Sequence, residues 1–516
     1  MLAKCHSGAI SGVDARAVEI EVDVSKGTNS FAIVGLPDQA VKEAKERVSK
    51  SISHSRFSLK GEFNVTVNLA PADVRKEGPI YDLPIAACFL KAVGRIKNEA
   101  LHEYALVGEL ALSGEVRRMC HGILPIVMEM KRIGKRAVIV PMENAEEASI
   151  VKGIDVLPVA TLREAVDFLN GELNIAPCYT DLMEKVFASR DLGDDFADVK
   201  GQHFVKRALE VAVAGGHNVL MIGSPGSGKT MLARRIPSIL PPLSVEEALE
   251  VAKIHSVAGI AKSRGSFAFN RPYRAPHHTV SSVGLLGGGA RVAPGEVSMA
   301  HRGVLFLDEF AEFPRNALEV LRQPLEDGHV EVSRAAAAHD FPSRFMLVAA
   351  MNPCPCGYYN DEAHTCRCSH REIAKYQGRV SGPLLDRIDI QVEVAAVSMK
   401  DLAKMESGEP SANIRARVVK AREIQLERYR DLGSELTNSA VKSRDLQRTC
   451  KITPKARDSL QGVLERLKLS ARAYDKILRV ARTIADLAGE EEIREEDVIG
   501  ASSYRRMDET IDSFWF

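Results

Sequence analysis

The sequence predicts an α/β protein built in three parts, and three observations carry this prediction. Gly223–Thr230 reads Gly-Ser-Pro-Gly-Ser-Gly-Lys-Thr and follows the apolar run Val219–Ile222. A second apolar run, Val304–Leu307, ends in two acidic residues. Beyond about residue 396 the strand signals fade, and apolar residues recur at helical spacing. We therefore expect a central P-loop unit with an α/β unit before it and helices after it.

Composition and charge limit the possible functions. The 516 residues allow about three domains, and 45% hydrophobic with 27% charged residues is typical of a folded globular protein. Lys plus Arg and Asp plus Glu both number 69, which excludes an overall basic surface for nucleic acid but leaves a local basic channel open. No apolar run approaches the length of a membrane span, and the first residues do not show the basic-then-apolar pattern of a signal peptide. We expect a cytoplasmic protein without a membrane partner.

Alternation of apolar and polar residues predicts the elements of the first part. Val18–Val24 and Phe63–Leu69 alternate as half-buried strands do, and residues 39–53 have a helical pattern. In the last part, Ser411–Arg430 and Asp475–Ala488 have apolar residues at helical spacing. The predicted domains are 1–172 (α/β), 173–197 (linker), 198–395 (P-loop core) and 396–516 (helical).

The glycine-rich motif predicts a nucleotide site that takes ATP. Its glycines let the backbone curl so that N–H groups face phosphate, and the following helix adds partial positive charge. Lys229 is expected at the β- and γ-phosphates and Thr230 at Mg²⁺. The residues predicted to bind the nucleotide are Gly223, Ser224, Pro225, Gly226, Ser227, Gly228, Lys229, Thr230 and Asp308.

Acidic and amide residues at two further strand ends complete the predicted site. Asp308 would hold Mg²⁺, and Glu309 would polarise the attacking water. A third predicted strand, Phe345–Ala350, is followed by Asn352, whose amide could orient water or contact the γ-phosphate. An Asp-Glu pair is also common as a solvated turn, and an Asn before proline is often a turn residue.

These motifs, with others along the chain, resemble the bacterial magnesium-chelatase-like AAA+ ATPases of the ComM/YifB group. The resemblance spans nearly the whole sequence and is more specific than a P-loop alone. The matching stretches are 34–48, 68–86, 198–202, the P-loop at 223–230, 273–289, 294–310, 349–357 and 381–390.

The resemblance implies an AAA+ core with a helix-2 insert, as in MCM helicases, assembled as a hexameric ring with a helical lid. Asn352 matches the sensor-1 position. Arg387 matches an arginine finger for the neighbouring subunit's ATP, since arginine offers permanently charged donors to the transferring phosphoryl group. The alternative for Arg387 is a surface ion pair with Asp386 or Asp389.

The lid carries a further arginine that the resemblance implies. Arg472 matches a sensor-2 arginine, with Arg479 as a second candidate. The segment 1–172 resembles the Lon-type protease fold, but Gly78–Asp82 has no serine where the nucleophile would stand, and Pro125 occupies the best match to the lysine position. We therefore expect a scaffold or DNA-contacting collar rather than a protease.

Four of the nine cysteines cluster after Asn352. Cys354, Cys356, Cys366 and Cys368 could close a tetrahedral zinc site, with His364 and His370 as alternative ligands. The Cys-x-Cys spacing is shorter than the common zinc spacing, and the alternative is a reduced, metal-free loop.

What the ring moves is predicted from the resemblance. The leading hypothesis is a DNA helicase that promotes branch migration in recombination and natural transformation, acting on single-stranded and branched DNA. The alternatives are a chelatase-like protein-remodelling or metal-insertion motor and, less favoured, an ATP-gated protease. Because the chain has no net charge, DNA contacts must be local. The predicted DNA residues are Arg274 and Arg291 in the insert, near His277 and His278, and Arg334 on a β-hairpin that starts at Gly328.

Overall fold

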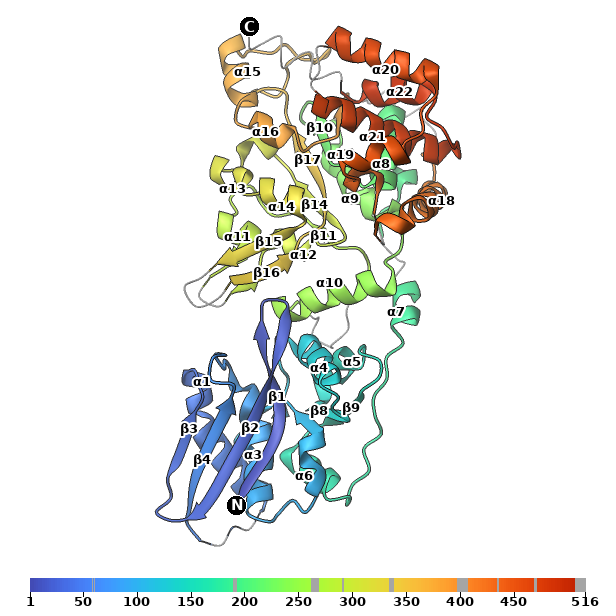
Figure 1. The fold of residues 1–516 in the computed structure, drawn as a ribbon. Helices are drawn as coiled ribbons and strands as arrows, with labels where there is room; N and C mark the ends of the chain where they lie inside the picture. Colours follow the sequence, from blue (N-terminus) through green and yellow to red (C-terminus); the bar gives the residue numbers. More distant parts are fainter. Residues whose placement is uncertain are drawn as a thin grey trace.

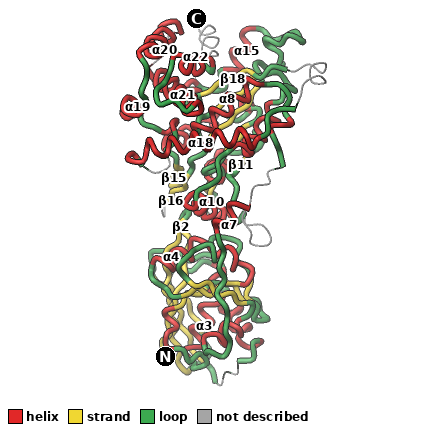
Figure 2. Tube along the Cα trace, turned by 90° about the vertical axis from the view of Figure 1, so that its right-hand side faces the viewer, coloured by secondary structure: helices red, strands yellow, loops and turns green. Residues whose placement is uncertain are grey.

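The computed structural model describes residues 1–57, 59, 61–188, 193–260, 269–289, 292–333, 338–396, 407–433, 436–467 and 471–505. The chain forms an elongated molecule with an N-terminal α/β domain at one end and the P-loop domain, flanked by the helical lid, at the other (Figure 1). A view turned by 90° shows that the molecule is narrowest near helix α10 (Figure 2). Among the residues just given, no helix is both long and apolar enough to span a membrane.

The N-terminal domain is built on a seven-stranded mixed sheet of order β3-β4-β2-β1-β5-β8-β9. Its centre is the long antiparallel hairpin of β1 (Leu2–Ser11) and β2 (Asp14–Lys26). The alternation of the sequence is confirmed, since Val18, Ile20 and Val22 are fully buried. The other strands are β3 (Phe31–Val34), β4 (Phe63–Ala70), β5 (Tyr104–Leu106), β8 (Ala137–Pro141) and β9 (Asp155–Val159), with a small separate pair, β6 (Glu109–Leu110) and β7 (Val116–Arg117).

Helices cover both faces of this sheet. The helical pattern at 39–53 forms two successive helices, α1 and α2, which pack with α3 and α6 in one core. Helices α4 and α5 pack on the other face. Their bounds are α1 (Gln39–Lys42), α2 (Ala44–His54), α3 (Asp82–Ala92), α4 (Ile123–Arg132), α5 (Ala145–Ala148) and α6 (Leu162–Leu169).

The P-loop domain has a five-stranded parallel sheet of order β11-β14-β17-β10-β18. Val219 and Met221 point to the core shared with the lid, whereas Leu220 and Ile222 point to the opposite core. Parallel strands end at one edge, where α/β proteins bind ligands. The strands are β10 (Val219–Ile222), β11 (Tyr273–Arg274), β14 (Val304–Leu307), β17 (Met346–Met351) and β18 (Ile390–Glu393).

Two hairpins project from this domain. Helices α11 (Ser282–Leu286) and α12 (Glu296–Met299) flank the short hairpin β12 (Gly287–Gly288) and β13 (Ala293–Pro294), which is the predicted insert. The predicted second hairpin is β15 (His329–Ser333) with β16 (Ala338–Pro342). The remaining helices are α8 (His203–Gly215), α9 (Lys229–Ile239), α10 (Val245–Ala258), α13 (Arg315–Glu319), α14 (Arg322–Asp327), α15 (His370–Gln377) and α16 (Gly382–Leu385).

The predicted helical C-terminal part is confirmed as a lid that shares one core with α8 and the P-loop sheet. It forms the red end of the ribbon, beside α8 and α9 (Figure 1). Its helices are α18 (Ser411–Tyr429), α19 (Ser443–Thr449), α20 (Pro454–Leu467), α21 (Ala471–Ala488) and α22 (Glu495–Ser503).

The two α/β domains meet at α10 and at the tip of the β1–β2 hairpin. Ser256 Oγ of α10 donates to Glu147 Oε1 at 2.6 Å, and Val13 at the hairpin tip is buried in the P-loop domain's core. The predicted linker 173–197 contains helix α7 (Leu182–Ala188), whose Leu182 is buried near α10. The boundaries between the four predicted segments stay predictions.

Candidate nucleotide-binding site

The loop that joins β10 to α9 wraps around the ammonium group of Lys229. Gly226 and Gly228 have φ angles of 78° and 95°, in the left-handed region that glycine adopts most easily. Lys229 Nζ donates to the carbonyl oxygens of Gly223 at 2.7 Å and Ser224 at 2.9 Å. Burial lowers the pKa of Lys229, against the charge of Asp308. The loop and the amino end of α9 therefore have the arrangement expected of a phosphate-binding turn.

A hydroxyl and a carboxylate meet directly beside this loop. Thr230 Oγ1 donates to Asp308 Oδ2 at 2.7 Å. Thr230 lies in the first turn of α9, and Asp308 directly follows β14. Both are hard oxygen ligands of the kind that Mg²⁺ takes together with nucleotide phosphates. The residues present thus fit a magnesium ion that arrives with ATP.

The side chain of Glu309 contacts a histidine, while its backbone N–H donates to Asp308 Oδ1 at 2.9 Å. The φ of 52° at Glu309 is left-handed, a conformation that costs an L-residue roughly 1–2 kcal/mol. A carboxylate oxygen of Glu309 lies 2.8 Å from Nδ1 of His278, with 58% of the glutamate side chain exposed. His278 lies in the segment 273–291 predicted to form the insert, and its ring lies against that of His277, with centroids 4.1 Å apart. Glu309, the second acid after β14, is therefore paired with His278 of the predicted insert segment.

Asn352 brings a third strand end to the site. It follows β17, which lies between β14 and β10 in the sheet. Its Oδ1 accepts a hydrogen bond from Lys229 Nζ at 3.3 Å. Residues predicted from three strand ends thus lie together: Lys229 contacts Asn352, and Thr230 contacts Asp308.

The loop 353–369 after Asn352 covers the P-loop. Ser224 Oγ donates to Asp361 Oδ2, and this hydrogen bond is the main cause that lowers the pKa of Asp361 to about 2. Gly357 approaches the P-loop so closely that a Cβ there would lie 2.7 Å from Pro225. The loop therefore contacts two consecutive residues of the phosphate-binding turn.

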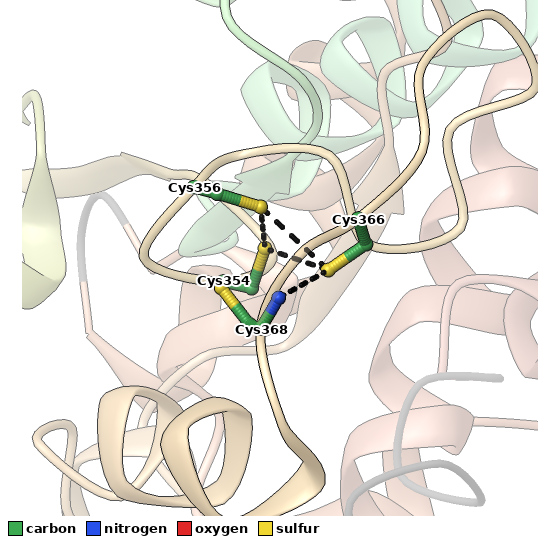
Figure 3. Close-up of side chains that lie close together, drawn as sticks. All are labelled: Cys354, Cys356, Cys366 and Cys368. Atoms are coloured by element: carbon green, nitrogen blue, oxygen red, sulfur yellow. Dashed lines mark hydrogen bonds between the residues drawn. The ribbon is translucent and has the colours of Figure 1, made fainter.

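The four clustered cysteines lie in this same loop and converge (Figure 3). Their Sγ atoms all lie within 4.8 Å of one another. Cys354 is buried, and its Sγ lies 3.4 Å from Cys356 and 3.7 Å from Cys366. Backbone N–H groups of Arg367 and Tyr358 lower the pKa of Cys356 to about 6. The cluster can hold a metal ion.

The predicted arginines lie at the opposite edge of the sheet. Asn218, directly before β10, donates from Nδ2 to the carbonyl of Arg387 at 2.8 Å, so Arg387 lies at the amino end of the strands. Four-residue β10 alone separates this edge from the P-loop by about 13 Å. The guanidinium of Arg387 forms an ion pair with Glu326, not with Asp386 or Asp389.

The lid arginines lie near the same edge. Arg472 is 74% exposed and its guanidinium lies 3.8 Å from Asp386, the residue before Arg387. Arg479 Nε donates to the carbonyl of Val441 at 3.0 Å. Arg472 thus lies beside the residue before Arg387, and Arg479 is close enough to Asp389 to lower its pKa. Within the described part of the chain, neither arginine contacts Lys229.

The predicted DNA contacts are only partly within the described residues. Arg291 and Arg334 lie outside them. Arg274 is held by Glu296 through two hydrogen bonds of 2.7 and 2.8 Å. This pair stabilises the insert, and a DNA contact by Arg274 would require it to open.

Sequence reasoning missed two partners within the site. His278 was considered only as a residue of the insert region, and Asp361 was not considered. The sequence around these two residues does not indicate their partners, because each contacts a motif that lies far away in the chain. Only the histidine pair at 277–278 and the acid between the cysteine pairs could have drawn attention to them.

Comparisons with known proteins place nearly the whole chain in one family. Three family models match, described as magnesium chelatase subunit ChlI at residues 195–402, subunit ChlI of Mg-chelatase at 20–144 and the ChlI C-terminal region at 408–505. Competence protein ComM of Haemophilus influenzae is 42% identical over 509 residues, which is 98% of both chains. An uncharacterised protein YifB of Escherichia coli is 42% identical over 505 residues, 98% of this chain and 97% of the relative.

A weaker match covers a smaller share of the chain. Lon protease 2 of Bacillus subtilis is 23% identical over 163 residues, 29% of each chain. The fold and the site define a magnesium-chelatase-like AAA+ ATPase with Lon-like similarity and a helical lid. Within that class, the chain belongs to the ComM/YifB family, as the full-length identity of 42% shows.

Proposed function

We propose that this chain is an ATP-hydrolysing ring motor that acts on DNA as a helicase and promotes branch migration. The observation that carries the ATPase part is the convergence of Lys229, Thr230, Asp308 and Asn352 at one sheet edge. These residue types are those that phosphoryl transfer requires, because the reaction concentrates negative charge. The magnesium ion, when bound with ATP, would neutralise part of that charge.

The chain's own residues have separate roles in the proposed hydrolysis. Lys229 would exchange its two carbonyl partners for phosphate oxygens, which are stronger acceptors. Asn352 would orient the γ-phosphate or the attacking water. Glu309 would accept a proton from that water once its contact with His278 opens.

The ring is supported by where the predicted finger lies. Arg387 and Lys229 lie at opposite edges of one sheet, so Arg387 cannot reach the ATP of its own subunit. A neighbouring subunit's ATP is the reasonable target, and a closed ring lets every subunit both give and receive a finger. Arg472, near Asp386, would act at the same boundary. We propose a homohexamer that forms with ATP and DNA.

Action on DNA is supported by the two hairpins and by the relative's name. A Cβ at Gly288 of the insert would lie 3.8 Å from Val332 Cγ1 of β15, so both hairpins share one surface. In the sequence, Arg291 lies between β12 and β13 and Arg334 directly follows β15, and these two arginines are the proposed contacts with single-stranded and branched DNA. The Haemophilus relative is a competence protein, which fits integration of incoming strands during transformation.

One experiment tests the motor directly. Full-length protein with ATP and Mg²⁺ is given a labelled three-strand branched substrate, and migration of the branch is followed on gels. ATP-dependent migration, with ATPase activity stimulated by single-stranded DNA, is the expected result. An ATPase that no DNA stimulates would contradict a DNA motor.

The second candidate function is a chelatase-like protein-remodelling or metal-insertion motor. The family models favour it, because all three are named for the magnesium-chelatase subunit. This candidate expects ATPase activity that responds to a protein partner and not to DNA. We do not propose a protease, because Gly78–Asp82 offers no serine nucleophile.

We further propose that the four cysteines bind one zinc ion. Tetrahedral zinc with Zn–S bonds of about 2.3 Å places sulfurs about 3.8 Å apart. The Sγ–Sγ distances of 3.4, 3.6 and 3.7 Å among Cys354, Cys356 and Cys366 are close to that value. His364 is engaged with Asp361 at 3.1 Å, which favours Cys368 over His364 as the fourth ligand.

A further inference from the structure

The loop 353–369 has little of its own to hold its shape. Between β17 and α15 it contains no helix or strand, and only Cys354 and Gly357 among its residues are buried as whole residues. A loop of this length without secondary structure is uncommon inside a compact domain unless it is functional or cross-linked. Four thiolates on one ion would provide that cross-link at four points.

Both ends of the loop are fixed. At its start, Gln377 Nε2 of α15 donates to the carbonyl of Pro353 at 3.0 Å. At its end, Ser369 and Glu372 form a capping box at the start of α15, directly after Cys368. The metal-binding residues therefore link β17 to α15, and Asn352 lies at the end of that β17 strand.

The middle of the loop is what contacts the P-loop. The carboxylate of Asp361 is held in the loop by the backbone N–H groups of Ala363 and His364, both at 2.9 Å. With its other oxygen it accepts the Ser224 hydroxyl, and its side chain is only 5% exposed. The position of Ser224 thus depends on where the loop places Asp361.

A second contact between the loop and the P-loop is the close packing of Gly357 against Pro225. Gly357 has φ of 88°, and its backbone is pressed against Pro225. Gly357 is the residue directly after Cys356, so an ion at the cysteines fixes this contact too. The cluster therefore controls two neighbouring contacts on the phosphate-binding turn, and both are made by the segment between Cys356 and Cys366.

We propose that the metal-loaded cysteine loop braces the P-loop, so that tight ATP binding requires zinc at Cys354, Cys356, Cys366 and Cys368. This inference rests on the zinc site proposed above. Without the ion the loop loses its cross-link, Asp361 and Gly357 no longer hold Ser224 and Pro225, and the donor surface for phosphate is no longer preorganised. The zinc takes no part in hydrolysis and acts through the loop.

The experiment compares zinc-loaded and zinc-stripped full-length protein. Zinc is removed with a chelator, the protein is returned to Mg²⁺ buffer, and zinc content is measured by elemental analysis. Affinity for a fluorescent ATP analogue is then measured before and after addition of ZnCl₂. We expect one zinc per chain, an affinity about tenfold weaker after stripping, and recovery with ZnCl₂.

A variant keeps the test valid if stripped protein unfolds. Asp361→Ala should keep its zinc, because no ligand is changed, yet bind the nucleotide about tenfold more weakly. Glu362→Ala, an exposed acid next in the chain, is the matched control and should behave as the unmodified protein. Stripping zinc from Asp361→Ala should add little further loss, since its main contact is already gone.

The outcomes separate the two proposals. Zinc at one per chain, with equal nucleotide affinity for loaded and stripped protein or for Asp361→Ala and Glu362→Ala, would overturn the brace and leave the zinc site standing. Protein that neither contains zinc nor takes it up from ZnCl₂ would overturn both. Neither result bears on whether the ring moves DNA, which the branch-migration assay decides.

Discussion

The imidazole of His278 lies 2.8 Å from the carboxylate of Glu309. Glu309, the acid expected to polarise water, thus contacts a residue of the predicted insert segment. Its own backbone is in a left-handed conformation. A strained backbone is typical of functional sites, and the contact with His278 has to open before Glu309 can accept a proton from water. If the insert binds DNA, movement of its segment would also move His278, so DNA binding and water activation are linked through this pair.

His278→Ala tests the link. Without the imidazole, Glu309 is released, so we expect the basal ATPase rate to rise several-fold while stimulation by DNA falls. Steady-state ATP hydrolysis with and without single-stranded DNA measures both. His277→Ala removes the stacked neighbour but not the pair, and it is the matched control. Basal activity lost in His278→Ala, with normal ATP binding, would mean that His278 positions Glu309 for catalysis.

Lys229→Ala and Glu309→Gln should separate binding from hydrolysis. The first loses the ammonium group that neutralises phosphate and should fail to bind a fluorescent ATP analogue. The second keeps every proposed phosphate contact, so it should bind ATP but hydrolyse it about 100-fold or more slowly. Equilibrium binding and single-turnover hydrolysis distinguish the two. Near-normal turnover by Glu309→Gln would show that another residue polarises the water.

Arg387→Ala should bind ATP and fail to hydrolyse it, because the finger serves the neighbouring subunit. Mixing Arg387→Ala with the inactive Glu309→Gln protein should restore partial activity, since some interfaces combine an intact site with an intact finger. Hydrolysis rates against mixing ratio, with mass photometry for ring size, provide the measurement. A monomer that hydrolyses ATP at the normal rate would exclude this arrangement.

Arg334→Ala addresses the proposed grip on DNA. Basal ATPase should remain, DNA stimulation should be lost, and DNA binding should weaken equally for all sequences with a shallower salt dependence. Ser333→Ala, on the same hairpin, is the control. If Arg334→Ala instead separates the ring while subunits still bind DNA normally, the residue belongs to the subunit interface.

His217→Ala should destabilise the junction between the P-loop domain and the lid. His217 is fully buried, with Nδ1 3.3 Å from Asp389 and Nε2 2.8 Å from Thr483 of α21. Burial alone raises the pKa of Asp389, but His217, Lys476 and Arg479 hold it below its ordinary value. Loss of the imidazole leaves a buried carboxylate short of a partner, at about 2–4 kcal/mol of unfolding free energy.

Denaturant unfolding measures that loss. The exposed His203 supplies a control, because His203→Ala changes the same residue type without removing a buried contact. A His217→Ala protein as stable as His203→Ala would show that water replaces the imidazole at this junction.

The sequence predicts the nucleotide side of this site well, and the reason is geometric. Asp308 and Asn352 directly follow apolar strands, and Lys229 ends the loop that follows a third. Parallel strands bring such ends together at one edge of a sheet. The clustered cysteines were found for a similar reason, since neighbours in sequence stay neighbours in space.

The rest depends on loops that meet only in the folded chain. Nothing near Ser224 indicates Asp361, and nothing near Glu309 indicates His278, because the distances between them are set by the packing of whole elements. For Arg387, sequence reasoning considered neighbouring acids as partners, whereas the structure pairs it with Glu326 of α14. The interrupted helix at 39–53 and helix α7 within the predicted linker are also decided by tertiary packing.

The buried tip of the β1–β2 hairpin has a mechanical consequence. Each strand of it spans roughly 30 Å, and the pair is stiff because every residue of β1 from Leu2 to Ser11 is paired with β2. One end is the centre of the N-terminal sheet, and at the other Gly12 lies against His339 and Asp340 of β16. We therefore expect a displacement of the β15–β16 hairpin by a few ångströms to be passed through the stiff β1–β2 hairpin and to rotate the N-terminal domain.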